Sequence, residues 1–217
     1  MPMLPLFPLS SVLFPGATLP LHIFEPRYQL MIGECIEHEQ HFGVVLIQSG
    51  EGVGATAEPH KVGTTARIVG VQRLPDGRMN IVTIGVRRFR IVALDRSRPY
   101  LSGDVEYIDR TDQQDEATMS EAVRVRELFS EYYRQTLALA DQWTRRVGLP
   151  SRPGMLADFV AGRLAVDANV KQKLLELDST RECLELESTM LDEAVVLLSD
   201  RVRTSQMKKF SDFGMLN

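Results

Sequence analysis

One histidine of this 217-residue chain stands close enough to a glutamate to suggest acid–base chemistry. His22 precedes Glu25 by three positions, and a histidine beside a carboxylate can act as a general acid or base. Such a pair also needs a third group that orients the imidazole, and the sequence displays none. The alternative is a strand histidine that hydrogen-bonds to the main chain. We therefore predict no catalytic residue and keep an enzyme that uses His22 and Glu25 as an alternative.

Two further histidines raise the question of a metal site. His38 and His41 lie near the end of a predicted helix, at a spacing that could bring both imidazoles to one ion. Protein metal sites use several ligands, and no nearby cysteine or third histidine completes a site here, which leaves Glu34 and Glu37 as further candidates. A solvated helix end is the simpler interpretation. The sequence predicts neither a metal site nor a cofactor.

The positions of the lysines argue against nucleotide binding. A phosphate-binding loop needs glycines followed by lysine and then serine or threonine, because main-chain amides and the ammonium group hold the phosphates together. None of the five lysines follows a glycine or precedes serine or threonine. Residues 50–54 (GEGVG) are rich in glycine, but no lysine follows them. We therefore expect no ATP site.

Basic residues gather in the middle of a chain whose formal net charge is −4. Residues 61–110 contain ten basic and five acidic side chains, and strand alternation places Arg88 and Arg90 on one face. That face is either solvated and ion-paired, or a cationic rim for an acidic peptide or a nucleic acid. Nucleic-acid binding is disfavoured, because the basic strands lack interleaved exposed aromatics and the chain is acidic. The arginines between residues 61 and 98 are Arg67, Arg73, Arg78, Arg87, Arg88, Arg90, Arg96 and Arg98.

Residues 13–28 predict the elements that would position these groups. Two apolar runs flank a proline–glycine turn, and the second run alternates as a strand does. Pro26 then suits the first position of a helix, because it has no amide proton to lose. We expect Phe24, Arg27 and Tyr28, at the junction of strand and helix, to form the wall of a partly exposed groove.

Short apolar runs continue to residue 108 and predict a sheet. Pro75, Asp76 and Gly77 suit the loop of a hairpin, and Gly85 separates two further runs. Many short strands with one early helix favour a closed barrel, because closure removes the exposed edges that invite aggregation. The predicted strands after the first helix cover residues 42–48, 66–74, 78–84, 86–94 and 102–108.

The second half of the chain has the pattern of helices. Residues 109–117 are polar and predict a linker. Two capping boxes, at residues 118–121 and 179–182, mark helix starts. Apolar stripes on such helices must be buried against one another, which favours a bundle. The predicted helices cover residues 118–147, 153–164 and 167–177, and a last one starts after residue 179.

The fold class predicted from these patterns is α+β, with a sheet domain over residues 1–110 and a helical bundle over residues 111–217. Four segments carry a more specific signal: residues 13–28, residues 62–68 (VGTTARI), residues 74–78 (LPDGR) and residues 84–91 (IGVRRFRI). In this order they resemble the N-terminal, substrate-binding domain of the Lon protease family, above all the stand-alone bacterial proteins that carry it without the protease. The resemblance spans roughly residues 3–108, and residues 167–176 extend it more loosely.

The resemblance implies a PUA-like β-barrel with one inserted helix, followed by an α-helical bundle. It also implies a non-catalytic polypeptide-binding or adaptor protein, because the phosphate loop and the Ser–Lys protease signature of the family are missing. Apolar grooves beside a barrel can accept an extended segment. We expect the peptide-binding residues to be Phe24, Arg27, Tyr28, Arg88 and Arg90. Related PUA-like folds bind RNA, so an RNA-binding module that uses residues 61–98 is kept as an alternative.

Composition favours the cytoplasm for such a protein. Cys35 and Cys183 are far apart, which argues against a disulfide framework and predicts two core thiols. No apolar run is long enough to span a bilayer, and prolines interrupt the N-terminal stretch where a signal sequence would be helical. The expected partner is a polypeptide, either an unfolded segment or a partner protein, and not a membrane. No motif specifies an oligomeric state.

Overall fold

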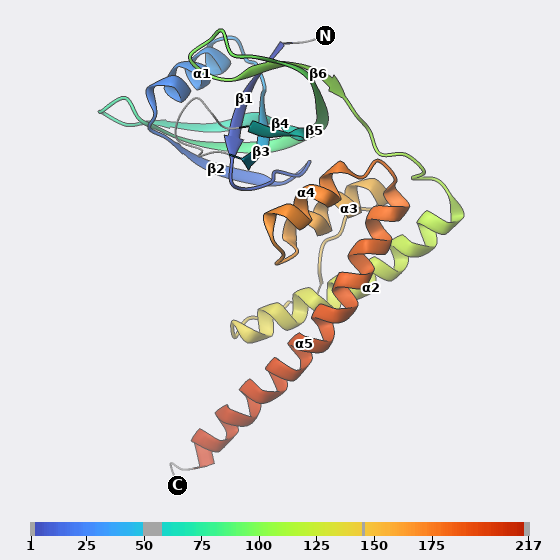
Figure 1. Ribbon diagram of the computed structural model, residues 1–217. Helices are drawn as coiled ribbons and strands as arrows, with labels where there is room; N and C mark the ends of the chain where they lie inside the picture. The colour runs from blue at the N-terminus through green and yellow to red at the C-terminus, as the bar shows by residue number, and fades with distance from the viewer. Residues whose placement is uncertain (1–2, 50–57, 145, 215–217) are drawn as a thin grey trace. The chain divides into compact units, whose positions relative to one another are not determined.

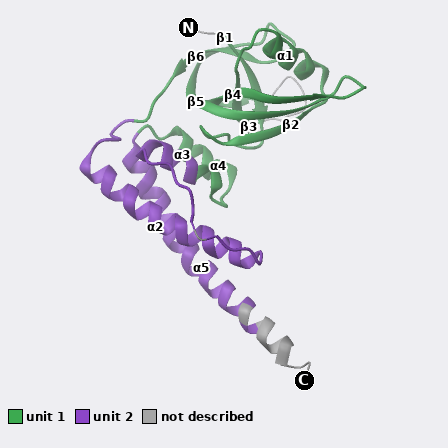
Figure 2. Ribbon diagram, turned by 180° about the vertical axis from the view of Figure 1, so that it is seen from behind, with its two compact units in different colours: residues 1–110, 161–178 green, residues 111–160, 179–217 purple. Residues whose placement is uncertain are grey.

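The computed structural model describes residues 3–49, 58–144 and 146–214 (Figure 1). The glycine-rich residues 50–54, which the sequence excluded as a nucleotide site, lie outside the described residues. Contacts between residues divide the chain into two compact units (Figure 2).

The first unit combines residues 1–110 with residues 161–178, and the second combines residues 111–160 with residues 179–217. Residues 161–178 therefore group with the sheet, whereas the sequence favoured one continuous helical part from residue 111 onward. The chain passes between the units three times, and one passage lies within a helix, α3 (Pro153–Arg163).

Within the described residues, six strands of the first unit form one sheet. They are β1 (Met3–Leu9), β2 (Thr18–Ile23), β3 (Phe42–Ser49), β4 (Glu58–Arg73), β5 (Met79–Asp95) and β6 (Ser102–Tyr107). The order of neighbours is β2-β5-β4-β3-β1-β6, and β5 also pairs with β6, so all strands except β2 form a closed ring of pairings. β1 and β3 are parallel, and the other pairs are antiparallel. Helix α1 (Pro26–Glu37) follows β2 and begins with Pro26, as the sequence predicted.

Gly85 lies inside a continuous strand and does not separate two strands. The prediction of a break at this position is wrong, because β5 runs from Met79 to Asp95. A Cβ atom at residue 85 would lie 2.3 Å from the carbonyl oxygen of Phe14. The main-chain N–H of Gly16 donates to the oxygen of Gly85 at 2.8 Å. The glycine therefore permits a close approach of two main chains.

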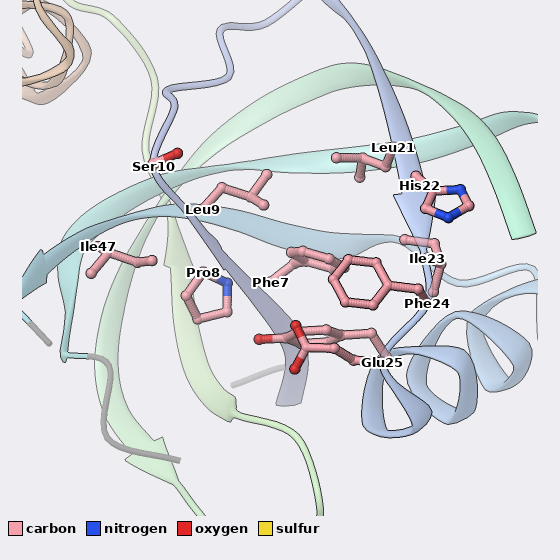
Figure 3. Close-up of a pocket in the computed structure, with 11 residues that line it drawn as sticks. Phe7, Pro8, Leu9, Ser10, Leu21, His22, Ile23, Phe24, Glu25 and Ile47 are labelled. Carbon is pink, nitrogen blue, oxygen red and sulfur yellow. The ribbon is translucent and has the colours of Figure 1, made fainter. Parts of the chain in front are cut away.

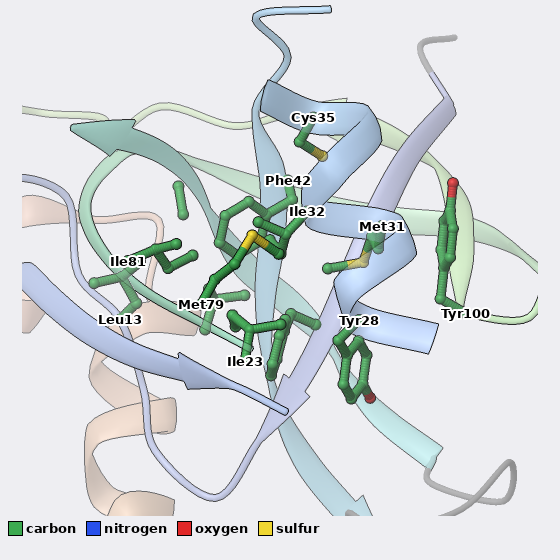
Figure 4. Close-up of a cluster of buried hydrophobic side chains, with 13 residues drawn as sticks. Leu13, Ile23, Tyr28, Met31, Ile32, Cys35, Phe42, Met79, Ile81 and Tyr100 are labelled. Carbon is green, nitrogen blue, oxygen red and sulfur yellow. The ribbon is translucent and has the colours of Figure 1, made fainter. Parts of the chain in front are cut away.

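Helix α1 closes one side of the sheet with a buried apolar cluster (Figure 4). Met31 and Ile32 are fully buried and pack with Phe42 of β3 and Ile81 of β5 in this cluster. Cys35 belongs to it as predicted, and burial raises the pKa of its thiol to about 11. A second cluster joins β1, β3, β5 and β6 through Leu4, Leu6, Val45, Phe89, Ile91 and Val105.

Two arginines of the first unit bind the C-terminal end of α4 (Ala168–Glu176). The last carbonyl groups of a helix have no partner within the helix, and cationic donors stabilise them. The guanidinium of Arg88 donates to the main-chain oxygens of Leu175 at 2.8 Å and Leu177 at 2.7 Å. Arg110 donates to the same Leu177 oxygen at 3.0 Å. These contacts explain why residues 161–178 belong to the sheet unit.

The second unit consists of α2 (Glu116–Leu139), the first part of α3, and α5 (Thr180–Gly214). α2 packs against α5, and both contribute fully buried side chains, among them Phe129 and Leu191. The ring of Phe129 meets that of Phe159 in α3 edge-on, with 5.8 Å between the centroids. None of the described helices combines the length and the apolar character that a membrane crossing requires.

Helix α2 differs from its prediction at both ends. It begins at Glu116, two residues before the expected capping box. It ends at Leu139 because Asp141 takes a left-handed conformation with φ of 56°, and the next N–H donates to the oxygen of Leu137 at 2.8 Å. Trp143 therefore lies beyond the helix and is 83% exposed, although the sequence placed it on the apolar stripe.

The start of α5 is capped by Ser179, the serine of the predicted box, and by an additional carboxylate. The main-chain N–H of Glu182 donates to the hydroxyl oxygen of Ser179 at 3.1 Å, as the predicted box requires. Asp112 accepts from the N–H of Thr180 at 2.6 Å and from the Ser179 hydroxyl at 2.6 Å. Burial alone would raise the pKa of Asp112, but these hydrogen bonds hold that pKa below its usual value.

Candidate functional site

A cavity of about 330 Å³ lies where the ends of β1 and β2 meet the start of α1 (Figure 3). We call it the junction pocket, and its wall consists of residues 7–10, residues 21–25, Tyr28 and Ile47. Most of this wall is apolar, and its polar side chains are those of Ser10, His22, Glu25 and Tyr28. Concave apolar surfaces with few polar groups are the usual form of a ligand site.

Phe24 is the exposed aromatic residue of the junction pocket. It is 57% exposed, whereas its neighbour Ile23 is almost completely buried. The difference follows from the alternation of a strand, which turns consecutive side chains to opposite faces. The Phe24 ring stacks on that of His22, with 6.0 Å between the centroids. A large apolar side chain beside an apolar cavity is therefore available for contact with a ligand.

Tyr28 forms the inner wall of the junction pocket and is only 5% exposed. Its ring stacks on Phe7 with 4.1 Å between the centroids, and the guanidinium of Arg27 lies 4.4 Å from its centroid. Arg27 also forms an ion pair with Glu25 at 2.9 Å. Burial raises the pKa of the Tyr28 hydroxyl, the positive charge of Arg27 opposes this rise, and Glu25 adds to it.

His22 and Glu25 both line the pocket but bind different partners. The Nδ1 atom of His22 lies 2.7 Å from the side-chain oxygen of Asn80, to which the register of β2 and β5 brings it. Glu25 is engaged by Arg27. Among the described residues, no hydrogen bond links the imidazole to the carboxylate, so the acid–base alternative has no geometric support.

Arg88 and Arg90 do not line the junction pocket. Arg88 is 2% exposed and binds the end of α4. Arg90 pairs with Asp178 at 3.3 Å, and Arg88 lies 3.5 Å from the same carboxyl group. The sequence suggested Asp95, Asp104 or Glu106 as partners, but the acidic residue comes from the segment after α4. The structure thus places Phe24 and Tyr28 in the wall of the junction pocket. Arg27 lies over the Tyr28 ring but does not line the pocket, and neither β5 arginine lines it.

The arginines of residues 61–98, Arg88 and Arg90 included, are largely paired. Six of the eight arginines in this segment form ion pairs with carboxylates. Arg87, for example, lies 2.6 Å from Asp109, and its hydrogen bond lowers the pKa of that carboxyl group. Paired charges of this kind are less available for contacts with phosphates.

A second cavity of about 490 Å³ adjoins the junction pocket over β2, β4 and β5. The two cavities share Leu21 and His22. The wall of the second one includes Val71 and Val82, both more than one-third exposed. Together the two cavities follow the edge strand β2, so they offer room for more than one side chain of an extended ligand.

Phe7, Pro8 and Ile47 line the pocket but were not among the predicted binding residues. Phe7 belongs to β1, an apolar N-terminal run that the sequence did not predict as a strand. Ile47 lies in a predicted strand, but only the parallel pairing of β1 with β3 brings it near Phe7. The available signal was the apolar character of residues 3–9, whose position in the sheet depends on distant partners.

The described residues contain no cluster of three histidine, cysteine, aspartate or glutamate side chains suited to a metal ion. His38 binds the main-chain oxygen of Glu34 within its own helix at 3.0 Å. His41 lies in the wall of another cavity, lined by α1 and β4 residues.

Comparison with known proteins identifies the family. The model of the ATP-dependent protease La (LON) substrate-binding domain matches residues 3–193. A Lon protease of Anaeromyxobacter dehalogenans is 29% identical over 92% of this chain and 24% of its own length. Lon protease 2 of Myxococcus xanthus is 28% identical over 92% of this chain and 25% of its own length. The chain thus spans about a quarter of the curated relatives that it matches.

Solved structures agree with this assignment. A crystal structure of a Lon N-terminal domain protein from Xanthomonas campestris has a TM-score of 0.62 and 28% identity, over 86% of this chain and 96% of that one. The N-terminal domain of a Mycobacterium avium complex Lon protease has a TM-score of 0.65 over 88% of this chain and 98% of that one. At 18% identity the second likeness concerns the fold alone. This chain belongs to the family of the Lon substrate-binding domain.

Proposed function

We propose that this chain is a non-catalytic polypeptide-binding protein and that the junction pocket receives the bound segment. The observation that carries the proposal is Phe24, an exposed aromatic side chain at the mouth of an apolar cavity, in a domain of the Lon substrate-binding family. The polypeptide is either an unfolded segment or a partner protein. We place this activity in the cytoplasm, because both cysteines are buried and neither forms a disulfide.

The edge strand β2 supports binding of an extended chain. Among the described residues β2 pairs only with β5, so its other edge is open to a further strand. Pro20 lies in the middle of β2 and lacks an N–H, which limits the number of main-chain hydrogen bonds along this edge. Recognition therefore depends on the apolar pocket as well as on the main chain, and we expect moderate affinity with broad sequence tolerance.

The closed ring of strand pairings supports the further proposal that the first unit is a PUA-like barrel and that the remaining helices form a bundle. RNA binding, the alternative suggested by the basic segment, is not favoured, because its arginines are largely ion-paired. Binding of single-stranded RNA that falls steeply with added salt would restore it.

The test compares an unfolded chain with the same chain folded. Fluorescently labelled ribonuclease A, reduced and carboxymethylated, is titrated with the protein, and native ribonuclease A is the control ligand. We expect binding of the unfolded form only. Phe24→Ser should weaken it about tenfold, the usual effect of losing an aromatic anchor. Trp143→Ser is the matched control, since Trp143 is also exposed but lies outside the pocket.

Both substitutions affect exposed side chains, so the free energy of unfolding should change by less than about 0.5 kcal/mol. The proposal fails if the protein ignores the unfolded ligand, or if Phe24→Ser and Trp143→Ser bind it equally well.

A further inference from the structure

The Tyr28 hydroxyl is not among the fully buried polar atoms that lack a partner in the described part of the chain, although the residue as a whole is buried. The residue is only 5% exposed and forms part of the junction pocket wall. A tyrosine of this kind has a buried ring and a polar tip that reaches the surface of the pocket, where the tip can form a hydrogen bond. In Figure 4 this hydroxyl points away from the other side chains of the apolar cluster. Its partner is therefore to be sought in what fills the pocket.

The contacts around Tyr28 hold the ring in place. Phe7 stacks on it, and the guanidinium of Arg27 lies over it, itself fixed by the ion pair with Glu25. The position of the hydroxyl is thus set before any ligand arrives, which lowers the entropic cost of a hydrogen bond. Burial keeps the phenol protonated at neutral pH, because it raises the pKa of Tyr28. The group is consequently available as a donor.

The surroundings select a neutral acceptor. The charges of Glu25 and Arg27 offset each other in their ion pair, and an anionic ligand group would lose its water in an apolar cavity, which is costly. A main-chain carbonyl is neutral, accepts strong hydrogen bonds and recurs at every residue of an extended chain. A contact to it adds affinity without demanding a particular side chain.

We propose that the Tyr28 hydroxyl donates a hydrogen bond to a main-chain carbonyl of the bound segment, beside the side chain that enters the junction pocket. This inference rests on the proposed polypeptide-binding function and assigns Tyr28 as a specificity-determining residue. The pocket selects an apolar side chain, and Tyr28 fixes the register of the main chain that carries it.

The test is a double-mutant cycle, in which Tyr28→Phe is combined with a ligand whose carbonyl is a weaker acceptor. The ligand is a fluorescein-labelled synthetic peptide with a central Leu-Phe-Leu sequence flanked by serine and glycine. In a series of analogues, one amide at a time becomes an ester, whose carbonyl is a poorer acceptor. Tyr28→Phe keeps the ring and its stacking on Phe7. Tyr107→Phe is the control, since Tyr107 lies on β6 and outside the pocket wall.

We expect Tyr28→Phe to raise the Kd of the parent peptide about three- to tenfold, the usual range for one neutral hydrogen bond. Tyr107→Phe should leave it unchanged. For the ester at one position, the Kd of the wild type should rise by the same three- to tenfold, whereas the Kd of Tyr28→Phe should not change.

Two results would overturn the assignment. If the wild type binds the peptide and Tyr28→Phe binds it equally well, the hydroxyl has no role, although the proposed function stands. If every ester affects wild type and Tyr28→Phe alike, the carbonyl contact is refuted in the same way. Failure of the wild type to bind both the peptide and the unfolded ribonuclease would remove the function and this inference together.

Discussion

Replacing Arg88 by methionine tests whether this buried arginine acts by attaching α4 to the sheet. Methionine has a similar length and keeps the apolar contacts of the side chain, but it removes two charged hydrogen bonds, at 2.8 and 2.7 Å. A hydrogen bond with a charged donor is worth about 1.5–3 kcal/mol. The Leu177 oxygen keeps its bond to Arg110, and removal of a buried charge recovers part of the desolvation cost. The net loss should be about 2–4 kcal/mol.

Arg90→Met is the matched control on the same strand. Arg90 pairs with the same Asp178, but its side chain is 41% exposed, against 2% for Arg88. An exposed ion pair contributes at most about 1 kcal/mol. The two arginines therefore share a strand and an acidic partner, but Arg88 is buried and hydrogen-bonds the end of α4, whereas Arg90 is exposed and pairs with Asp178.

Hydrogen exchange of the α4 amides is the most direct assay, because two units of one chain can unfold separately and blur a global transition. In Arg88→Met these amides should exchange roughly 30- to 1000-fold faster than in the wild type. In Arg90→Met they should change by less than about tenfold. Equal exchange in both variants would refute the argument that these hydrogen bonds hold α4 in place. Loss of ligand binding in Arg88→Met with α4 protection intact would instead assign this arginine to recognition.

Two further predictions concern stability. Asp112→Ala should destabilise the second unit by about 1 kcal/mol, while Asp115→Ala should have little effect, because Asp115 precedes α2 without a side-chain capping bond. Since the pKa of Asp112 is lowered in the folded state, the stability difference between the wild type and Asp112→Ala should be full above about pH 4–5 and fade as the pH falls through that lowered pKa. A difference in urea midpoints that does not change with pH would contradict this prediction. Gly85→Ala should destabilise the first unit by more than about 2 kcal/mol, because its Cβ would meet the Phe14 oxygen. Gly33→Ala, in α1 with open space around the new methyl group, should stabilise it by up to about 1 kcal/mol; thermal shifts of the same sign in both glycine variants would show the reasoning to be wrong.

Local patterns predicted the elements that depend on neighbouring residues. The alternation of β2, the start of α1 at Pro26 and the turn before β5, where Gly77 takes φ of 85°, all follow from nearby side chains. Gly85 misled the prediction, because its role depends on the main chain near Phe14, far away in sequence. The prediction for Trp143 was wrong for a related reason. A periodic stripe shows which face of a helix is apolar, but it does not show where the helix ends.

The candidate site shows the same difference between features that neighbouring residues determine and features that distant residues determine. Phe24, Arg27 and Tyr28 were predicted because they lie together at one junction of strand and helix. Arg88 was assigned to a binding rim because its burial depends on residues 175–178, which no pattern within β5 reveals.

The connection between Arg88 and α4 also has a consequence for synthesis on the ribosome. The sheet strands and Arg110 emerge first, but the carbonyl groups that complete the first unit follow about seventy residues later. At about 5–20 residues per second this interval lasts about 4–14 s. During that time the newly made strands carry two arginine side chains without their helical acceptors. Arg88 and Arg110 of the nascent N-terminal half can therefore become buried only after a distant part of the same chain has been synthesised.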